Sequence, residues 1–196
     1  MLFNARSICN KLDYITCQLD DPRFHPSIVL VTESWLNASI PNCFIDFNGR
    51  FQVFRKDRDN LGGGVLALVD TKISACNVSL SNIFSALELV CFDVFMPLLT
   101  VRFILCYRPP KYDVCATNYL SSLLQCIEQL TASKLPTILV GDFNLPHVDW
   151  GTMNASSDSF HQQFLDCVVR NGFLQYVIEP SRGNNILDLV MCNDAF

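Results

Sequence analysis

The stretch TILVGDFN, at residues 137–144, joins an apolar run to a glycine, a carboxylate and an amide with no other charge between them. An apolar, β-branched run of this length is typical of a strand buried in a sheet. Gly141, Asp142 and Asn144 are residue types that favour turns, but α/β proteins also build their sites from polar groups at strand ends. The stretch therefore predicts a buried strand ending at Asp142, followed by a turn, a functional site or both.

Two other stretches place a carboxylate on a buried strand. SIVLVTE, at residues 27–33, ends in Glu33, and ILDLVM, at residues 186–191, holds Asp188 within it. Any one of these acids alone most simply marks the point where a strand leaves the core. Three together predict carboxylates gathered at one edge of a sheet, and gathered oxygens are what a hard cation such as Mg²⁺ requires.

The rest of the chain alternates between helix-like and strand-like patterns. Apolar residues at helical spacing predict helices over residues 7–19, with Ser7 as a candidate cap, and over residues 118–130 and 159–170. Two hairpins are expected, one from residues 51–54 and 65–69, the other from residues 86–95 and 98–107. Hairpins mixed with helical crossovers favour a layered α/β fold with a mixed sheet. No linker or repeat divides the chain, so we expect one domain over residues 1–196.

Composition indicates a globular protein. Half of the residues are apolar, 17% are charged, and the net charge of -5 argues weakly against a nucleic-acid partner, although a bound cation would invert the field near an acidic site. The ten cysteines include no CxxC pair, which leaves zinc ribbons unsupported and favours reduced thiols. Without an apolar signal segment or membrane span, we expect an intracellular protein, cytoplasmic or nuclear, with no membrane partner.

Five motifs follow one another along the chain: Asn4, TESW at 32–35, YRPP at 107–110, GDFN at 141–144 and NNILDLV at 184–190. In this order they resemble the endonuclease/exonuclease/phosphatase superfamily. The sequence is similar in particular to the endonuclease of LINE-type non-LTR retrotransposons, in the segments NARSICNKLD, VTESWL, LGGGV, YRPP and EPSRGNNILDLV. The resemblance covers essentially the whole chain, and it implies a DNase I-like α/β sandwich with mixed β-sheets flanked by helices.

The resemblance implies roles for single residues. Glu33 matches the family glutamate that holds a divalent metal, usually Mg²⁺ with Mn²⁺ as the alternative, and Asn4 matches the asparagine beside it. Asp142 matches the aspartate that activates or positions the attacking water, and Asn144 the amide that contacts the scissile phosphate. Tyr107 matches the tyrosine whose hydroxyl approaches that phosphate.

Four further residues complete the predicted site. Asp188 matches the aspartate that orients a catalytic histidine from a later Ser-Asp-His motif. Arg108 would add positive charge beside the tyrosine, and Ser181 and Arg182 match a loop with a hydroxyl and a guanidinium, which are good phosphate partners. We therefore expect Arg108, Ser181 and Arg182 to bind substrate.

Several of these residues have a plainer interpretation. Asn4 fits a helix cap, Tyr107 fits ordinary packing at a strand end, and Ser181 fits a turn as well as it fits phosphate binding. A cluster of basic residues fits a solvated hairpin turn better than a weak DNA-binding surface. Its members are Arg55, Lys56, Arg58, Arg108 and Lys111.

The sequence departs from the family pattern near its end. No Ser-Asp-His string occurs, and His25, His147 and His161 stand elsewhere, where we expect surface or structural roles. The expectation is a domain incomplete at both termini, lacking most of the first strand and the C-terminal strand. Removing a general acid or base typically costs about 10²- to 10⁴-fold in rate, so the sequence leaves enzymatic activity undecided.

Three hypotheses follow. The first is a Mg²⁺-dependent DNA endonuclease domain of a non-LTR retrotransposon, which nicks target DNA and acts with a reverse-transcriptase domain of the full-length element. The second is a phosphoesterase of the same superfamily that acts on a small phosphoester. The third is a catalytically dead remnant, or an incomplete gene model, that at most binds DNA weakly.

Overall fold

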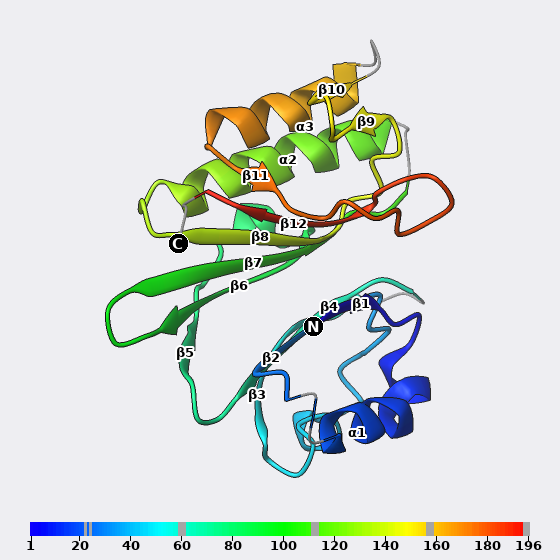
Figure 1. Ribbon diagram of the computed structural model, residues 1–196, viewed down its shortest axis with the longest axis vertical. Coiled ribbons are helices and arrows are strands. Elements are labelled where there is room, and N and C mark those ends of the chain that lie inside the picture. Colours follow the sequence, from blue (N-terminus) through cyan, green and yellow to red (C-terminus); the bar gives the residue numbers. More distant parts are fainter. Residues whose placement is uncertain (22, 24, 59–61, 111–113, 156–158, 194–196) are drawn as a thin grey trace.

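The structure is a computed structural model that describes residues 1–21, 23, 25–58, 62–110, 114–155 and 159–193. Its elements form four layers, with α1 on one side, two sheets in the middle, and α2 and α3 on the other side (Figure 1). This is the α/β sandwich with mixed sheets and flanking helices that the sequence predicts.

The helices and strands have the following bounds, in chain order: β1 Leu2–Asn4, the 3-10 helix η1 Ile8–Lys11, α1 Leu12–Asp20, β2 Ile28–Thr32, η2 Asn42–Phe44, β3 Phe51–Lys56, β4 Val65–Asp70, β5 Ser74–Asn77, η3 Asn82–Phe84, β6 Glu88–Phe95, β7 Thr100–Tyr107, α2 Val114–Thr131, β8 Thr137–Asp142, β9 Val148–Asp149, β10 Asn154–Ala155, α3 Ser159–Arg170, β11 Leu174–Gln175 and β12 Asp188–Cys192.

The first sheet has the strand order β1-β2-β4-β3. β1 runs parallel to β2, and β4 pairs antiparallel with both β2 and β3, which confirms the first expected hairpin. Successive side chains of β2 point to opposite faces of the sheet, and both faces are buried. Val29 and Val31 pack on the α1 side, and Leu30 packs between the two sheets. The sheet therefore joins two apolar layers.

The second sheet has the order β11-β12-β8-β7-β6-β5. β6 and β7 form the second expected hairpin, and β7 runs parallel to β8 through the crossover helix α2. Leu89 and Cys91 face the layer of α2 and α3, whereas Val90 and Phe92 face the first sheet. The outward and inward faces of this sheet are both covered, as its long apolar strands require.

Three phenyl rings tie the two sheets together. The ring of Phe54, from the first sheet, stacks on Phe92 at 5.0 Å, and Phe92 stacks on Phe103 at 5.1 Å. Such pairs contribute about 0.5–1.5 kcal/mol beyond the area they bury. The stack holds the sheets face to face and so fixes the ends of β2 and β8 relative to one another.

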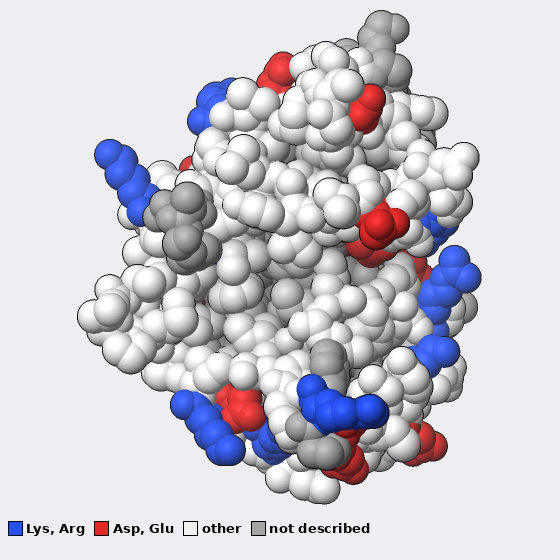
Figure 2. Space-filling model, in the orientation of Figure 1, with Lys and Arg blue, Asp and Glu red and all other residues white. Residues whose placement is uncertain are grey.

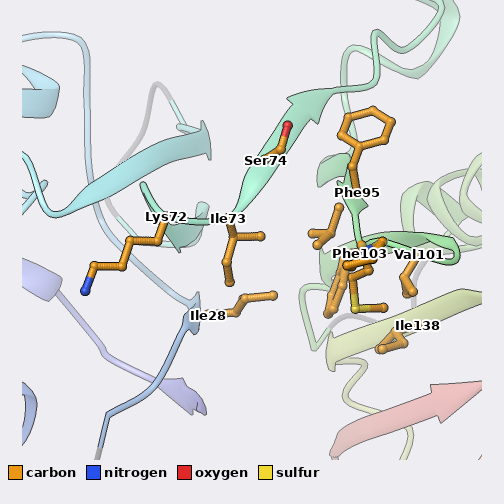
Figure 3. Close-up of a pocket in the computed structure, with 11 residues that line it drawn as sticks. Ile28, Lys72, Ile73, Ser74, Phe95, Val101, Phe103 and Ile138 are labelled. Carbon is orange, nitrogen blue, oxygen red and sulfur yellow. The ribbon is translucent and has the colours of Figure 1, made fainter.

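An apolar cavity of about 610 Å³ lies between the sheets, at the opposite end of the strands from the predicted carboxylates. Ile28, Phe103 and Ile138 line it, and each lies in the first half of its own strand, away from Glu33, Tyr107 and Asp142 (Figure 3). Its lining is apolar apart from Lys72 and Ser74, and it contains none of the predicted site residues.

Some elements differ from the prediction. The expected helix over residues 7–19 divides into η1 and α1, and Ser7 makes no side-chain cap because its φ is 88°. β5 was not predicted because its sequence SACN lacks an apolar alternation. The short strands β9, β10 and β11 were not predicted either, since two residues carry no periodicity. Within the described residues, no helix is both long and apolar enough to cross a membrane.

Candidate functional site

Three strands of the second sheet place their polar residues in one row. Tyr107 pairs with Asp142 in the parallel register of β7 and β8, and Asp142 pairs with Asp188 in the antiparallel register of β8 and β12. Residues in register across neighbouring strands lie side by side. The structure therefore brings the three predicted residues together at one edge of the sheet.

The first sheet adds Asn4 and Glu33 to this row. Asn4 ends β1 opposite Thr32, the residue before Glu33. Its side-chain amide donates one hydrogen bond to Oε1 of Glu33 at 2.7 Å and another to Oδ2 of Asp142 at 3.1 Å. One amide group thus links carboxylates from two sheets, whereas the residue at the N-cap position of η1 is Ser7 and not Asn4.

The backbone after β2 is held in an unusual conformation. Glu33 and Trp35 both have positive φ, of 51° and 53°. The N–H of Ser34 donates to the carbonyl of Gly64, the N–H of Trp35 donates to that of Gly63, and the indole N–H of Trp35 donates to Oε2 of Glu33 at 3.4 Å. Left-handed non-glycine residues cost of order 1–3 kcal/mol each and persist only where their surroundings hold them.

The turn after β8 is fixed by Gly141 and Asn144. A Cβ atom on Gly141, whose φ is +144°, would overlap the carbonyl oxygen of Cys106 on the neighbouring strand. Asn144 has a φ of 49°, its backbone N–H donates to Oδ1 of Asp142 at 3.2 Å, and its side-chain amide donates to the carbonyl of Arg108 at 2.9 Å. The turn and the site residue are therefore held by the same bonds.

Arg108 lies beneath this turn instead of facing the open side of the site. Its side chain is buried, its Nε donates to the carbonyl of Phe143 at 2.6 Å, and its Nη2 donates to the carbonyl of Asn144 at 2.5 Å. The guanidinium also lies over the ring of Phe160, at 4.9 Å. This placement supports the turn and does not match the expected substrate-binding role.

Arg182 is the cationic group on the open side. Its side chain is about half exposed, its Nη2 lies 4.0 Å from Oδ2 of Asp142, and its Nη1 donates to Oδ1 of Asn144 at 3.4 Å. Ser181, in contrast, turns its hydroxyl toward the backbone and accepts the N–H groups of Leu187 and Asp188 at 3.0 and 3.1 Å. The structure favours the turn interpretation for Ser181 and places the half-exposed guanidinium of Arg182 beside Asp142 and Asn144.

Burial and neighbouring charge perturb the acids of the site. Burial, and then the carboxylate of Asp188, raise the pKa of Asp142 to about 6, although hydrogen bonds from Asn4 and the charge of Arg182 oppose the rise. Burial also raises the pKa of Tyr107, and the carboxylates of Glu33 and Asp142 raise it further. Oδ1 of Asp188 is buried without a hydrogen-bond partner among the described residues. An acid that titrates near neutral pH and an orphaned carboxylate oxygen are features of a functional site.

Arg55 and the three histidines lie outside this row. Arg55 pairs with Asp57 and donates to the carbonyls of residues 37 and 40, which supports the hairpin-turn interpretation. His25 and His147 are exposed, and His161 is buried among aromatic rings, as surface and structural histidines are. Lys111 lies outside the described residues.

A divalent cation fits the donor chemistry of the row. The described residues hold no cluster of three or more His, Cys, Asp or Glu side chains of the kind that makes an all-protein metal cage. Mg²⁺ does not need one, since it keeps several waters and uses one or two carboxylates. Glu33 and Asp142 converge on one amide, and their hard oxygens with an excess of negative charge suit such an ion.

Sequence reasoning missed Glu88 and considered Arg58 only as part of the basic cluster, although both residues lie beside the site. Glu88 is a buried acid at the start of β6, directly opposite Tyr107 in the strand register. Arg58 pairs with Glu88 and lies over the Tyr107 ring, at 5.7 Å. The sequence did carry one signal for Glu88, which is an acid at the start of the apolar run ELVCF. An acid in such a run is buried only when its charge is paired, so the run predicts a partner for Glu88.

Comparison with known proteins gives one family and several solved structures. Residues 101–196 match the protein family described as Endonuclease-reverse transcriptase. No curated protein sequence matches the chain significantly.

The fold is shared with several DNA-processing enzymes of known structure. The 3′ phosphatase NExo from Neisseria, bound to a product DNA hairpin, superposes with a TM-score of 0.71 at 11% identity, over 97% of this chain and 84% of that one. The endonuclease domain of TRAS1, a telomere-specific non-LTR retrotransposon, gives 0.67 at 16% identity, over 98% and 84%. An AP endonuclease from Archaeoglobus fulgidus gives 0.64 at 12% identity, over 98% and 85%. At these identities the likeness establishes the fold.

Proposed function

The chain shares the fold of these nucleases and phosphatases, and on this premise we propose that it belongs to the endonuclease/exonuclease/phosphatase superfamily and is a divalent-metal-dependent phosphodiesterase that nicks DNA, as the endonuclease domain of a non-LTR retrotransposon. The observation that carries the proposal is the bridge that Asn4 makes between Glu33 and Asp142. The bridge joins Glu33, the carboxylate that we assign to the metal, to Asp142, the carboxylate that we assign as the general base, and the two belong to different sheets. The match of residues 101–196 to the Endonuclease-reverse transcriptase family supports the retrotransposon branch and a reverse-transcriptase partner.

The residues of the row divide the chemistry between them. Asp142, with a pKa near 6, is mostly ionised at pH 7 and basic enough to take a proton from a water molecule that attacks phosphorus. Arg182 and the hydroxyl of Tyr107 are the donors for the phosphate oxygens, and Asn144 holds its carboxamide beside both Asp142 and Arg182. These groups act by positioning and by charge, which is what phosphoryl transfer mainly requires.

Mg²⁺ is the cofactor we assign to the site, with Mn²⁺ as a substitute. Glu33 would hold the ion with Asn4 beside it, and the ion would supply positive charge to the phosphate oxygens. The positive φ of Glu33 and its bond from Trp35 keep the carboxylate in one place before any cation arrives. Pre-organisation of this kind lowers the cost of binding.

Nicking of supercoiled plasmid by the purified 196-residue chain tests the proposal. We expect relaxed circles in the presence of Mg²⁺ or Mn²⁺, none with EDTA, and none from Glu33→Ala or Asp142→Ala. Asp166→Ala, on the exposed face of α3, is the matched control and should nick as the unaltered protein does. Intact plasmid at high enzyme and metal concentration, with the protein folded by circular dichroism, would reject the proposal and support the catalytically dead alternative.

The likeness to a 3′ phosphatase bound to DNA motivates one competing activity. A labelled oligonucleotide carrying a 3′-phosphate separates the two, because an endonuclease shortens it internally whereas a 3′ phosphatase removes only the terminal phosphate. Release of inorganic phosphate from small phosphoesters, without any nicking, would favour the small-molecule alternative.

A further inference from the structure

Glu88 is a buried carboxylate that the proposed chemistry does not use. It begins β6, where it lies directly opposite Tyr107 in the antiparallel pairing with β7. A charge in this position is expensive unless each of its oxygens is paired. Both oxygens are paired, and each partner belongs to a different part of the candidate site.

The first oxygen, Oε2, accepts the backbone N–H of Gly64. The carbonyls of Gly63 and Gly64 in turn accept the N–H groups of Trp35 and Ser34. Through this turn, Glu88 supports the strained backbone that follows Glu33, the residue we assign to the metal. Glycine suits position 63, because its φ is +69° and a Cβ atom on it would displace the same carboxylate oxygen.

The second oxygen, Oε1, accepts Nε of Arg58 at 2.9 Å, and Nη2 of the same guanidinium also donates to it. The guanidinium carbon lies 5.7 Å from the centre of the Tyr107 ring, within the range of a cation–π contact. Tyr119 adds a second link, since its hydroxyl accepts the N–H of Glu88 at 2.9 Å and donates to the carbonyl of Tyr107 at 3.0 Å.

We propose that Glu88 is a positioning residue that sets two parts of the site at once: the Glu33–Trp35 backbone through Gly64, and the Tyr107 ring through Arg58. The inference rests on the proposed nuclease function, to which it adds residues that touch neither metal nor phosphate. Displacement of a reacting group by about 1 Å can cost on the order of 10²-fold in rate. Loss of the Glu88 contacts therefore acts on turnover more than on binding.

Glu88→Gln is the variant that tests this role. It keeps the size of the side chain and one acceptor oxygen, but its NH₂ group faces a donor, either Gly64 N–H or Arg58. Asp93→Asn is the matched control, because Asp93 lies on the same strand and forms a partly buried cross-strand ion pair with Arg102 at 2.8 Å, far along β6 from the site.

For nicking, we expect Glu88→Gln to lower kcat about 10- to 100-fold with KM within about threefold, and Asp93→Asn to change neither value by more than about twofold. Arg58→Lys, which keeps the charge but not the planar contact, should lower kcat in the same way. A raised KM with unchanged kcat in Arg58→Lys would make Arg58 a DNA contact and overturn the proposal. So would equal kcat in Glu88→Gln and Asp93→Asn.

A second readout does not depend on catalysis. Trp35 and Trp150 are the tryptophans of the chain, and in a Trp150→Phe background the fluorescence emission reports on Trp35 alone. We expect Glu88→Gln to shift this emission and Asp93→Asn to leave it unchanged. If the unaltered protein does not nick DNA, the proposed function fails, but the emission still decides whether Glu88 positions the Trp35 backbone. Identical spectra in all three proteins would overturn the proposal.

Discussion

Asp188 lies directly opposite Asp142 in the register of β12 and β8, so two carboxylates share one edge of the sheet. Burial and the charge of Asp188 raise the pKa of Asp142 from 3.8 to about 6 in the folded protein. The folded state therefore holds the proton of Asp142 more tightly than the unfolded state does. At neutral pH the ionised Asp142 destabilises the fold that it is proposed to serve.

This relationship predicts that Asp142→Asn stabilises the metal-free protein at pH 7.5. At about 1.4 kcal/mol per pKa unit, the shift sets an upper bound of about 3 kcal/mol. An amide keeps one acceptor oxygen, so the variant loses the hydrogen bond from either Asn4 or the N–H of Asn144, which lowers the expected gain to about 1–2 kcal/mol. Urea unfolding in EDTA measures it. The gain should shrink as the pH falls from about 6 to about 4, because stability lost on ionisation of Asp142 returns in that window. A constant difference across this range would contradict the argument.

Metal binding should reverse this instability. Because Mg²⁺ binds only the folded arrangement of Glu33 with its neighbours, millimolar Mg²⁺ is expected to raise the midpoint of thermal unfolding, and EDTA to lower it again. Glu33→Gln should abolish the shift. Glu128→Gln, on the exposed end of α2 where it pairs with Arg170, should keep it. An equal shift in both variants would place the ion elsewhere.

Gly141→Ala is expected to be among the most damaging single changes in the chain. The added methyl group meets the carbonyl oxygen of Cys106 on a strand that cannot withdraw, and φ of +144° adds strain, so we expect a loss above about 3 kcal/mol. Gly172→Ala is the control, since its φ is +70° but no atom lies within 4 Å of the new methyl group. It should cost about 1–2 kcal/mol, from conformation alone. Chemical unfolding measures the free energy of unfolding of the two variants. Similar losses in both would contradict the argument, because they would show that β7 can move away from the added methyl group.

Arg108→Lys should weaken the turn that carries Asn144. A lysine cannot donate to the carbonyls of Phe143 and Asn144 from the same planar group, and buried hydrogen bonds to a charged group contribute about 1.5–3 kcal/mol. We expect a loss of about 2–4 kcal/mol in unfolding free energy, with nicking reduced as well. Arg170→Lys, in an exposed pair with Glu128, should change the stability by less than about 0.5 kcal/mol. Full stability in Arg108→Lys, with a raised KM for DNA, would restore the substrate-binding interpretation.

Much of the fold was predictable because its signals are local. The apolar runs of β2, β7 and β8 and the helical spacing of α2 and α3 are each complete within the segment that forms the element. The strands that escaped prediction, β5 and β9 to β11, are short or polar, and their pairing depends on neighbours far along the chain. Ser7 failed as a cap because its backbone is held by Glu33, 26 residues later, through a 3.0 Å bond to the carbonyl of that residue.

The candidate site was also predictable only in part. Asn4, Glu33, Asp142 and Asp188 were found from motif and strand-end position, and the structure places them in one row. The direction of a side chain was not predictable in this way. Arg108 points inward and Ser181 toward its own turn, because each satisfies backbone groups that exist only in the folded turn. Glu88 was missed because its partners come from three separate segments.

The bridge from Asn4 to Asp142 also sets the order in which the candidate site can assemble during synthesis. A ribosome makes Asn4 and Glu33 early, but Asp142 and Asp188 emerge only after more than a hundred further residues. Until β8 and β12 have docked on the first sheet, the nascent chain holds only Glu33 of the three carboxylates of the row, and no place where a phosphate could meet them all. A chain cleaved or stalled between the two sheets leaves fragments that each lack part of the row, so we expect neither fragment to carry the proposed nuclease activity.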